Sequence, residues 1–320
     1  MAQRDKKERI SVMEWINRKR IFKPSGEFGW MNSHAQIPTV LDMGDKLRVY
    51  FSSRPKAGLS MTGFMDVDRE QPDKILNIHE KQILEVGPIG SFDGHGIMPQ
   101  YVCFNGDEVW MYYSGWDRRV DIPYSNWTGL AISKDGGVTF EKAFAGPVVD
   151  RTPDEVYSAT GCYILRDDDG WHMWYASGVE WTEIEGHFEE YYVIKYAHSD
   201  DGVSWTRENR QLLPPEEPRR PTHRPSVIKL GDEYHLLFCF RGLEDFRDGK
   251  NAYRIGHASS TDMLNWTRSD DEAGIVPSGE GWDSNMNAYP YLVQTDTRVF
   301  LFYCGNGFGA EGFGYAELRR

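Results

Sequence analysis

The fold is decided by a pattern that is plainest at residues 97–116, IMPQYVCFNGDEVWMYYSGW. An apolar segment that includes a proline is followed by an Asn-Gly-Asp turn and then by an aromatic segment that ends in serine and glycine. Asn-Gly turns favour the positive φ angles of tight hairpins, and aromatic and β-branched residues favour strands. The stretch therefore predicts a hairpin of two buried β-strands.

The same pattern recurs in four other segments, QIPTVLDMGDKLRVYFSSR (36–54), SATGCYILRDDDGWHMWYASG (158–178), HRPSVIKLGDEYHLLFCFRG (223–242) and NAYPYLVQTDTRVFLFYCGN (287–306). The copies are 61–65 residues apart, counted between Pro38, Pro99, Gly161, Pro225 and Pro290. A third strand and a turn follow each of the middle copies, as in VIKYAHSDDGVSWTRE (193–208). Repeats of about 60 residues with four short antiparallel strands are typical of propeller blades.

We therefore predict an all-β protein, a five-bladed β-propeller of four-stranded antiparallel blades over residues 30–320. Residues 1–29 are predicted to form an N-terminal lead that caps the propeller or closes its last blade. Solenoids are the competing class of repeat protein, but their repeats are usually shorter and lack this four-strand rhythm.

The composition and net charge of the chain limit the classes of partner that it is expected to bind. The chain has 320 residues, a formal net charge of −13 and 14% aromatic residues. Nucleic acids and anionic membranes require a basic face, so neither is an expected partner. There is no apolar run long enough for a membrane span, and the charged start MAQRDKKERISVMEW contains no apolar signal segment. We expect a cytoplasmic protein whose oligomeric state the sequence leaves open.

Cysteine usage argues against a disulfide framework and a zinc site. The four cysteines, Cys103, Cys162, Cys239 and Cys304, are scattered and show neither Cys-x-x-Cys nor His-Cys spacing. No ligand spacing in the sequence requires a metal, and no cofactor is expected to be required.

Polar residues recur just before the first strand and at the end of the second strand of each repeat. The first strands of a propeller line its central channel, so these residues are expected to converge at one mouth. The candidate catalytic carboxylates are Asp93, Asp283, Glu180 and Glu155. The candidate substrate-binding residues are His34, Gln36, Arg54, His95, Trp116, Arg224, Arg241 and Asn287, and the same leads contain Gln100, Thr160 and His223.

This set of residues has the chemistry of a sugar site. Carboxylates serve as acid, base or nucleophile, arginine, amide and imidazole groups bond hydroxyls, and indole rings stack on sugar faces. Arg54, Arg224 and Arg241 are the residues that would pair with an anionic group such as a uronate or sialic-acid-type carboxylate. An otherwise acidic channel is expected to repel phosphate-rich polymers.

Structural roles are the alternative for several of these residues. Asp93 and Asp283 lie in turn-like sequences where an aspartate caps backbone amides, and Glu155 follows a proline in a predicted loop. Arg224 and Arg241 are alternatively ion-paired within one blade. The acidic run EEYY at 189–192 is expected to be a solvated loop.

Six motifs together resemble a bacterial family of five-bladed "glycosylase" proteins, which is similar to the arabinanase, levansucrase and invertase superfamily of glycoside hydrolases (families 43 and 32). They are SHAQIPT (33–39), FDGHGIMPQ (92–100), MYYSGW (111–116), WHMWYASGVEW (171–181), HRPSVI (223–228) and GWDSNMNAYP (281–290). The domain also resembles the N-terminal region of plant glucosamine inositolphosphorylceramide transferases. The resemblance implies a propeller with a carbohydrate ligand in its channel, a place in a surface-polysaccharide pathway, and a structural calcium ion as an option.

The chain departs from the hydrolases of that superfamily in its first repeat. Where those enzymes have an aspartate, this sequence has Ser33, His34 and Gln36 but no carboxylate. The leading hypothesis is a glycosidase-like carbohydrate-active enzyme that uses Asp93 and Asp283 as its carboxylate pair, with Glu180 or Glu155 as a third. In a variant of this hypothesis His34 is the general base. The alternatives are a non-catalytic glycan-binding propeller and, with less support, a transferase or lyase that acts on an activated sugar. The last has no glycine-rich phosphate loop to support it.

Overall fold

The computed structural model describes residues 12–55, 59–214, 218–247 and 249–319. Residues 1–11 of the predicted N-terminal lead lie outside the described part of the chain. Nearly all regular structure is antiparallel β-sheet, as the repeats predict. In the described residues, no helix has the length and apolarity that crossing a membrane would require.

The sheets follow the repeats of the sequence. The first contains β2 (Ser33–Asp42), β3 (Lys46–Arg54), β4 (Met61–Asp68) and β5 (Ile75–Ile78). The next is eight-stranded and contains β6 (Gly96–Asn105), β7 (Glu108–Arg118), β8 (Tyr124–Ser133), β9 (Glu141–Lys142), β10 (Ser158–Asp167), β11 (Gly170–Ile184), β12 (His187–Ser199) and β13 (Thr206–Gln211). Its two halves, β6–β9 and β10–β13, are joined by a parallel pairing of Ala159 with Trp127.

Two further four-stranded sheets complete the molecule. One contains β14 (Thr222–Leu230), β15 (Glu233–Phe240), β16 (Arg254–Ser260) and β17 (Thr267–Arg268). The other contains β18 (Ala288–Gln294), β19 (Val299–Cys304), β20 (Phe313–Leu318) and the N-terminal strand β1 (Trp15–Phe22). Short helical turns lie at η1 (Asp270–Ala273), η2 (Gly281–Asp283) and α1 (Asn306–Gly309). Strand β1 pairs with β20, so the two ends of the chain share one sheet.

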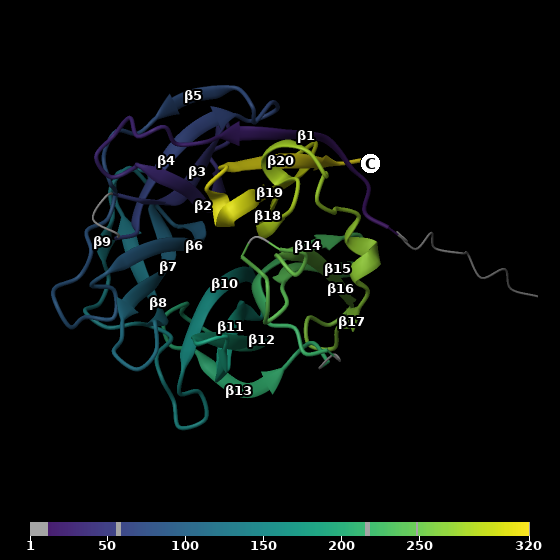
Figure 1. Cartoon of the computed structure of the whole chain (residues 1–320). Helices are drawn as coiled ribbons and strands as arrows, with labels where there is room; N and C mark the ends of the chain where they lie inside the picture. The colour runs from purple at the N-terminus through teal and green to yellow at the C-terminus, as the bar shows by residue number, and fades with distance from the viewer. Residues whose placement is uncertain (1–11, 56–58, 215–217, 248, 320) are drawn as a thin grey trace, which may run out of the picture.

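The sheets stand around a common axis, as in a propeller (Figure 1). Their first strands contact one another in a closed cycle, in which β2 meets β6, β6 meets β10, β10 meets β14, β14 meets β18 and β18 meets β2. The second strands are buried between their neighbours, and every residue of β19 is buried. Strands that are covered on both faces carry continuous apolar runs, which explains the aromatic segments of the repeats.

The turns after the third strands are built alike. Asp135, Asp201 and Asp262 each accept a hydrogen bond from a serine two residues earlier and cap backbone amides that follow. Such Asx turns reverse the chain at little cost. The aromatic residue after each turn is then brought down onto the sheet, where Phe140 and Trp266 are buried.

Candidate functional site

A cavity of about 300 Å³ lies at the axis, and every first strand contributes to its wall. Its lining includes Ile37 of β2, Gln100 of β6, Thr160 of β10, His223 of β14 and Tyr289 of β18. We call it the central cavity. Gln100, Thr160 and His223 come from three different repeats and line the same cavity. The segments that precede the first strands therefore converge, as the repeats predict.

A neighbouring hollow of about 440 Å³, the side cavity, shares part of this wall. The residues common to both are Ile37, Arg54, Met98, Tyr124, Asn126 and Tyr289. Gln36 and Trp116 line the side cavity, and Arg241 lines the central one. Four of the predicted binding residues, Gln36, Arg54, Trp116 and Arg241, thus lie at these connected hollows.

The first strands are irregular where they border the central cavity. Each carries a register shift near its marker proline or glycine, for example between His223 and Ser226. Ile37, Arg224 and Tyr289 have φ angles of 57°, 55° and 58° there. Positive φ is strained for side chains with a Cβ, above all for β-branched isoleucine. Bulges of this kind redirect side chains beside functional sites, which fits the position of Ile37 and Tyr289 in the wall.

The predicted carboxylates Asp93, Glu155 and Asp283 are not in this wall. Each is 1–2% exposed and bonds a tyrosine of the second strand in its own sheet. The tyrosine hydroxyl lies 3.0 Å from Asp93 (Tyr113), 2.9 Å from Glu155 (Tyr175) and 2.8 Å from Asp283 (Tyr303). In all three the tyrosine follows the carboxylate by 20 residues.

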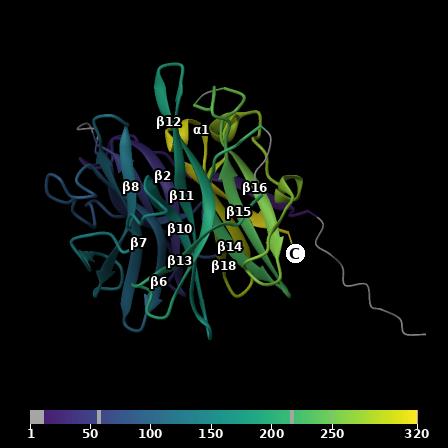
Figure 2. The same ribbon diagram turned by 90° about the horizontal axis from the view of Figure 1, so that it is seen from below.

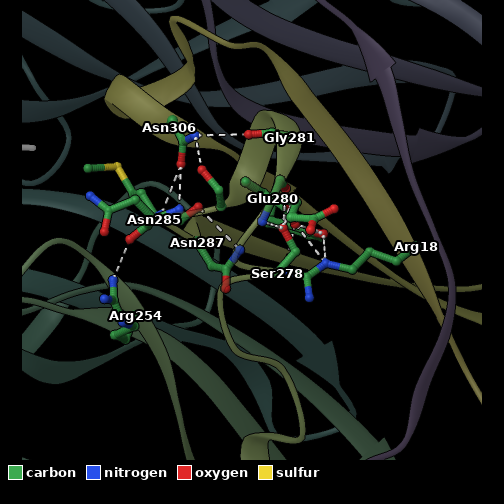
Figure 3. Close-up of polar contacts among 12 residues, drawn as sticks. Arg18, Arg254, Ser278, Glu280, Gly281, Asn285, Asn287 and Asn306 are labelled. Atoms are coloured by element: carbon green, nitrogen blue, oxygen red, sulfur yellow. Dashed lines mark hydrogen bonds and ion pairs between the residues drawn. The ribbon is translucent and has the colours of Figure 1, made fainter. Parts of the chain in front are cut away.

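A cation from the outer strand completes each arrangement. Asp93 pairs with Lys142 of β9 at 2.6 Å, Glu155 with Arg207 of β13 at 3.0 Å, and Asp283 with Arg18 of β1 at 2.7 Å. Figure 3 shows Arg18 reaching from β1 toward the loop that carries Ser278 and Glu280. The structure therefore does not bring Asp93 and Asp283 together across a substrate. It places each in an ion pair that ties a loop to the edge of its own sheet.

The remaining predicted residues outside the two cavities also have partners. Glu180 pairs with Arg219 at 2.9 Å on the surface, and His95 bonds Asp117 at 2.9 Å beside Trp116. His34 bonds Ser33 at 3.0 Å, and burial, followed by the charge of Arg54, lowers the pKa of its imidazole to about 4. Asn287 is buried and donates to the carbonyl of Met286 at 3.2 Å.

The loop before β18 is held by Asn306. Its side chain accepts from the amides of Asn285 and Met286 at 2.9 and 3.1 Å and donates to Ser284 at 2.9 Å (Figure 3). It thereby fixes the chain that leads into Asn287.

Arg224 is fully buried, does not line the central cavity and ties the first strands together. Its guanidinium donates to Gln100 Oε1 of β6 and to Thr39 Oγ1 of β2, both at 2.9 Å, and to the Cys162 carbonyl of β10 at 3.4 Å. The ring of Tyr291 in β18 lies 5.5 Å away. Arg224 is therefore not available to a ligand in the cavity, and its ion pairing within one blade is also not observed among the described residues.

Sequence reasoning missed a wall formed by third strands. Tyr124 and Asn126 of β8 and Phe188, Glu189 and Tyr192 of β12 all line the central cavity. Strands β11 and β12 continue past the sheet as a hairpin that projects on the same face as α1 (Figure 2). The signal in the sequence was the run EEYY, which the structure places in strand β12 and not in a solvated loop.

Glu190 in this run is the most perturbed carboxyl group near the cavity. It is fully buried, bonds Ser158 Oγ at 2.5 Å, and burial raises the pKa of its carboxyl to about 7 against the lowering effect of hydrogen bonds from Ser158 and Tyr192. The hydroxyls of Tyr192 and Tyr124 lie 2.7 Å apart. Both tyrosines line the cavity, whereas Glu190 Oε2 has no hydrogen-bond partner among the described residues.

The charge of the central cavity is opposite to that of the whole protein. Its charged lining residues are Arg54, Arg241, Arg247 and Glu189. The expectation of an acidic channel is therefore wrong. His223 in the same wall is neutral at physiological pH, because burial, reinforced by Arg224 and Arg241, lowers the pKa of its imidazole to about 3. In the described parts of the chain, no three His, Cys, Asp or Glu side chains are grouped as metal ligands.

Comparisons with known proteins agree with this fold. No family model matches the chain. Two uncharacterized proteins of Mycobacterium tuberculosis, from strains CDC 1551 and H37Rv, are 36% identical over 308 residues, which is 96% of this chain and 99% of theirs.

Two solved structures illustrate the likeness in three dimensions. A thermostable family-43 glycoside hydrolase matches with a TM-score of 0.61 and 16% identity, over 93% of this chain and 92% of its own. A family-32 β-fructofuranosidase of Bombyx mori matches with a TM-score of 0.63 and 17% identity, over 96% of this chain and 62% of its own. Likeness at these identities establishes the fold alone, which is that of β-propeller glycoside hydrolases.

Proposed function

Because the chain belongs to the same family as the two uncharacterized M. tuberculosis proteins and has the fold of the family-43 and family-32 glycoside hydrolases, we propose that it is a glycosidase-like carbohydrate-active protein. Its substrate site is the central cavity together with the side cavity. We also read the closed cycle of first strands as five blades, each with four strands. A substrate from a surface-polysaccharide pathway and a cytoplasmic location are further proposals, which rest on the sequence alone.

The observation that carries this proposal is the composition of the cavity wall. Aromatic rings of Tyr192, Tyr289 and Phe308 stand beside hydrogen-bonding groups of Gln100 and Asn126. Ligand pockets combine apolar surface with a few placed polar groups, and pyranose rings present both an apolar face and a rim of hydroxyls. A wall of this kind at the axis of a propeller suits one or two sugar rings.

Acid–base chemistry at this site would come from β12. Glu190 has a pKa near the pH of the cell, as a general acid needs, but it is buried. Its neighbour on β12, Tyr192, lines the cavity and shares a 2.7 Å hydrogen bond with the Tyr124 hydroxyl. Glu189 lines the cavity itself and pairs with Arg247 at 2.6 Å. We assign Glu190 as the proton source, the two tyrosines as the groups that pass the proton to a leaving oxygen, and Glu189 as the carboxylate that faces the substrate.

A non-catalytic glycan-binding propeller is the second candidate. Asp93, Glu155 and Asp283 are all held in ion pairs. Glu189 is therefore the one carboxylate among the described lining residues of the central cavity, which favours this second candidate. Hydrolysis by the usual route uses two carboxyl groups that flank the glycosidic bond. The two candidates differ in turnover and not in binding.

The test is a turnover screen with aryl glycosides and oligosaccharides, followed by kinetics of Glu190→Gln and Tyr192→Phe. If the assignment holds, both variants bind saccharide as the parent protein does but lose at least tenfold in kcat. Tyr101→Phe is a control of the same chemistry, because Tyr101 is a half-buried tyrosine of β6 that packs on Tyr163 and lines neither cavity. Binding without turnover of any glycoside would select the glycan-binding candidate.

A further inference from the structure

The central cavity carries more positive than negative charge. Three arginines and one glutamate line it, which is a net formal charge of +2 in a protein of net charge −13. Glu189 is 2.6 Å from Arg247 and 3.8 Å from Arg241, so a single carboxylate is shared between two cations. A wall of this charge attracts anions in spite of the acidic surface of the protein.

Arg241 is held rigidly in this wall. It is 3% exposed, and its guanidinium donates to the carbonyls of Gly242 at 2.9 Å and Glu190 at 3.1 Å. The ring of Phe246 lies 3.7 Å from the guanidinium carbon. Its Nε is buried and has no hydrogen-bond partner in the described structure. A buried cation with a donor left over is costly unless a ligand supplies an acceptor.

Arg54 lies at the junction of the central and side cavities. Its Nε donates to Gln36 Oε1 at 3.1 Å, and within residues 12–55, 59–214, 218–247 and 249–319 it forms no ion pair with a carboxylate. Arg54 is an exposed residue at the end of β3. Partial desolvation lowers the pKa of its guanidinium, which reflects a cation that lacks a counter-charge.

We propose, on the basis of the function above, that the ligand of the central cavity includes a phosphate group, bound by Arg54 and Arg241. A phosphate monoester carries a charge of about −1.5 to −2 near pH 7 and three acceptor oxygens. Its charge matches the net positive charge of the cavity wall. A uronate carries a single charge and would leave one arginine uncompensated, and a neutral sugar would leave both. The phosphate is either part of the sugar or free phosphate bound beside a neutral sugar.

The lining supplies neutral donors for the remaining oxygens. Asn126 and the Tyr124 hydroxyl come from β8, and the neutral imidazole of His223 offers one N–H, with its Nδ1 unpartnered among the described residues. Arginines match phosphate through paired N–H groups, so they fix its orientation as well as its charge. The sugar ring would then lie against Tyr289 and Trp116, toward the side cavity.

Isothermal titration calorimetry on the full chain tests this inference. The probes are hexose 1- and 6-phosphates, the matching neutral hexoses, galacturonate, and inorganic phosphate with and without a neutral oligosaccharide. We expect phosphate-bearing probes to bind at least tenfold more tightly than neutral ones, and Arg54→Gln to remove most of that gain. Arg166→Gln is the matched control, because Arg166 is an exposed arginine at the far end of β10 that bonds Asn105.

The outcomes separate the two phosphate sources and the two proposals. If hexose phosphates bind more tightly than neutral hexoses, the phosphate is part of the sugar. If inorganic phosphate tightens the binding of a neutral oligosaccharide, the ligand is free phosphate bound beside the sugar. The inference is overturned if galacturonate binds more tightly than the hexose phosphates. It is also overturned if Arg54→Gln still binds phosphate-bearing probes more tightly than neutral ones. Neutral saccharides that bind as tightly as phosphorylated ones overturn the inference alone, whereas the absence of any saccharide binding overturns the proposed function as well.

Discussion

The carboxylate of Asp283 accepts a 2.8 Å hydrogen bond from the hydroxyl of Tyr303, which follows it by 20 residues. The same spacing and the same bond link Asp93 with Tyr113 and Glu155 with Tyr175. Three buried carboxylates that lie outside the cavity thus tie loops to their sheets, and the proposed chemistry therefore involves β12 instead.

Replacing Asp283 by Asn is expected to lower stability and not ligand affinity. The amide can still accept from Tyr303, but Arg18 loses its counter-charge. Removal of one partner of a buried ion pair costs about 3 to 5 kcal/mol, and the partial exposure of Arg18 places the expected loss near the lower figure. Urea denaturation measures this cost, and calorimetry with the best saccharide checks affinity. Tyr303→Phe is the milder companion variant. A loss of turnover in Asp283→Asn at unchanged stability would show that the carboxylate acts in catalysis.

Replacing Arg224 by Met is expected to weaken the joint between the first strands. The acceptors of Gln100, Thr39 and Cys162 would be left buried without their donor, which costs about 2 to 4 kcal/mol in total after the relief of a desolvated cation. Thermal unfolding followed by circular dichroism measures the loss. Arg224→Lys should recover part of it, because lysine keeps the charge and some of the donors. Equal stability of the parent protein and Arg224→Met would contradict the structural role.

Glu190 makes folding stability fall as pH rises. Its pKa is about 7 in the folded protein against 4.5 ordinarily, so the folded state holds the proton more tightly. The stabilisation is complete below pH 4.5 and is lost as pH rises through 7, by roughly 3 kcal/mol at about 1.4 kcal/mol per pKa unit.

The difference between the parent protein and Glu190→Gln isolates this contribution from those of the histidines. The variant should gain stability relative to the parent protein between pH 5 and pH 8, as measured by urea unfolding at each pH. A difference that stays constant over this interval would contradict the raised pKa.

Trp116 is expected to contribute to saccharide affinity through its ring. It lines the side cavity next to the His95–Asp117 pair, and stacking on a sugar face is expected to contribute about as much as an aromatic pair, on the order of 0.5 to 1.5 kcal/mol. Trp116→Ala should therefore raise the Kd of an oligosaccharide about tenfold and that of a monosaccharide less. The matched control is Trp205→Ala, because Trp205 directly precedes β13, packs on Tyr112 and lines neither cavity. Equal effects of the two substitutions would indicate a general loss of structure.

Most of the architecture could be predicted from the sequence, because each repeat carries its own strands and turns. The Asp-Gly turn at Asp201 and the aromatic run of β19 are local signals. The convergence of Gln100, Thr160 and His223 also follows from the repeat, since equivalent positions meet at the axis of a propeller.

The roles of the carboxylates could not be predicted in the same way. The cation that pairs with Asp283 is Arg18, which is 265 residues away and reaches it only because β1 pairs with β20. The burial of Glu190 depends on the extension of β11 and β12 past the sheet and on the absence of a side chain at Gly178, whose Cβ would overlap the Glu190 carboxyl group. The run EEYY at 189–192 gives no local indication that the strands extend past the sheet or that Gly178 leaves room for the Glu190 carboxyl group.

The most direct test of the central claim is a crystal structure of the protein with the saccharide that binds most tightly in the calorimetric panel. We expect a sugar in the central cavity within hydrogen-bond distance of Arg54, Arg241 or His223, with Asp93, Glu155 and Asp283 still in their ion pairs. A sugar bound elsewhere with the central cavity empty, or one that touches a released Asp93 or Asp283, would contradict it.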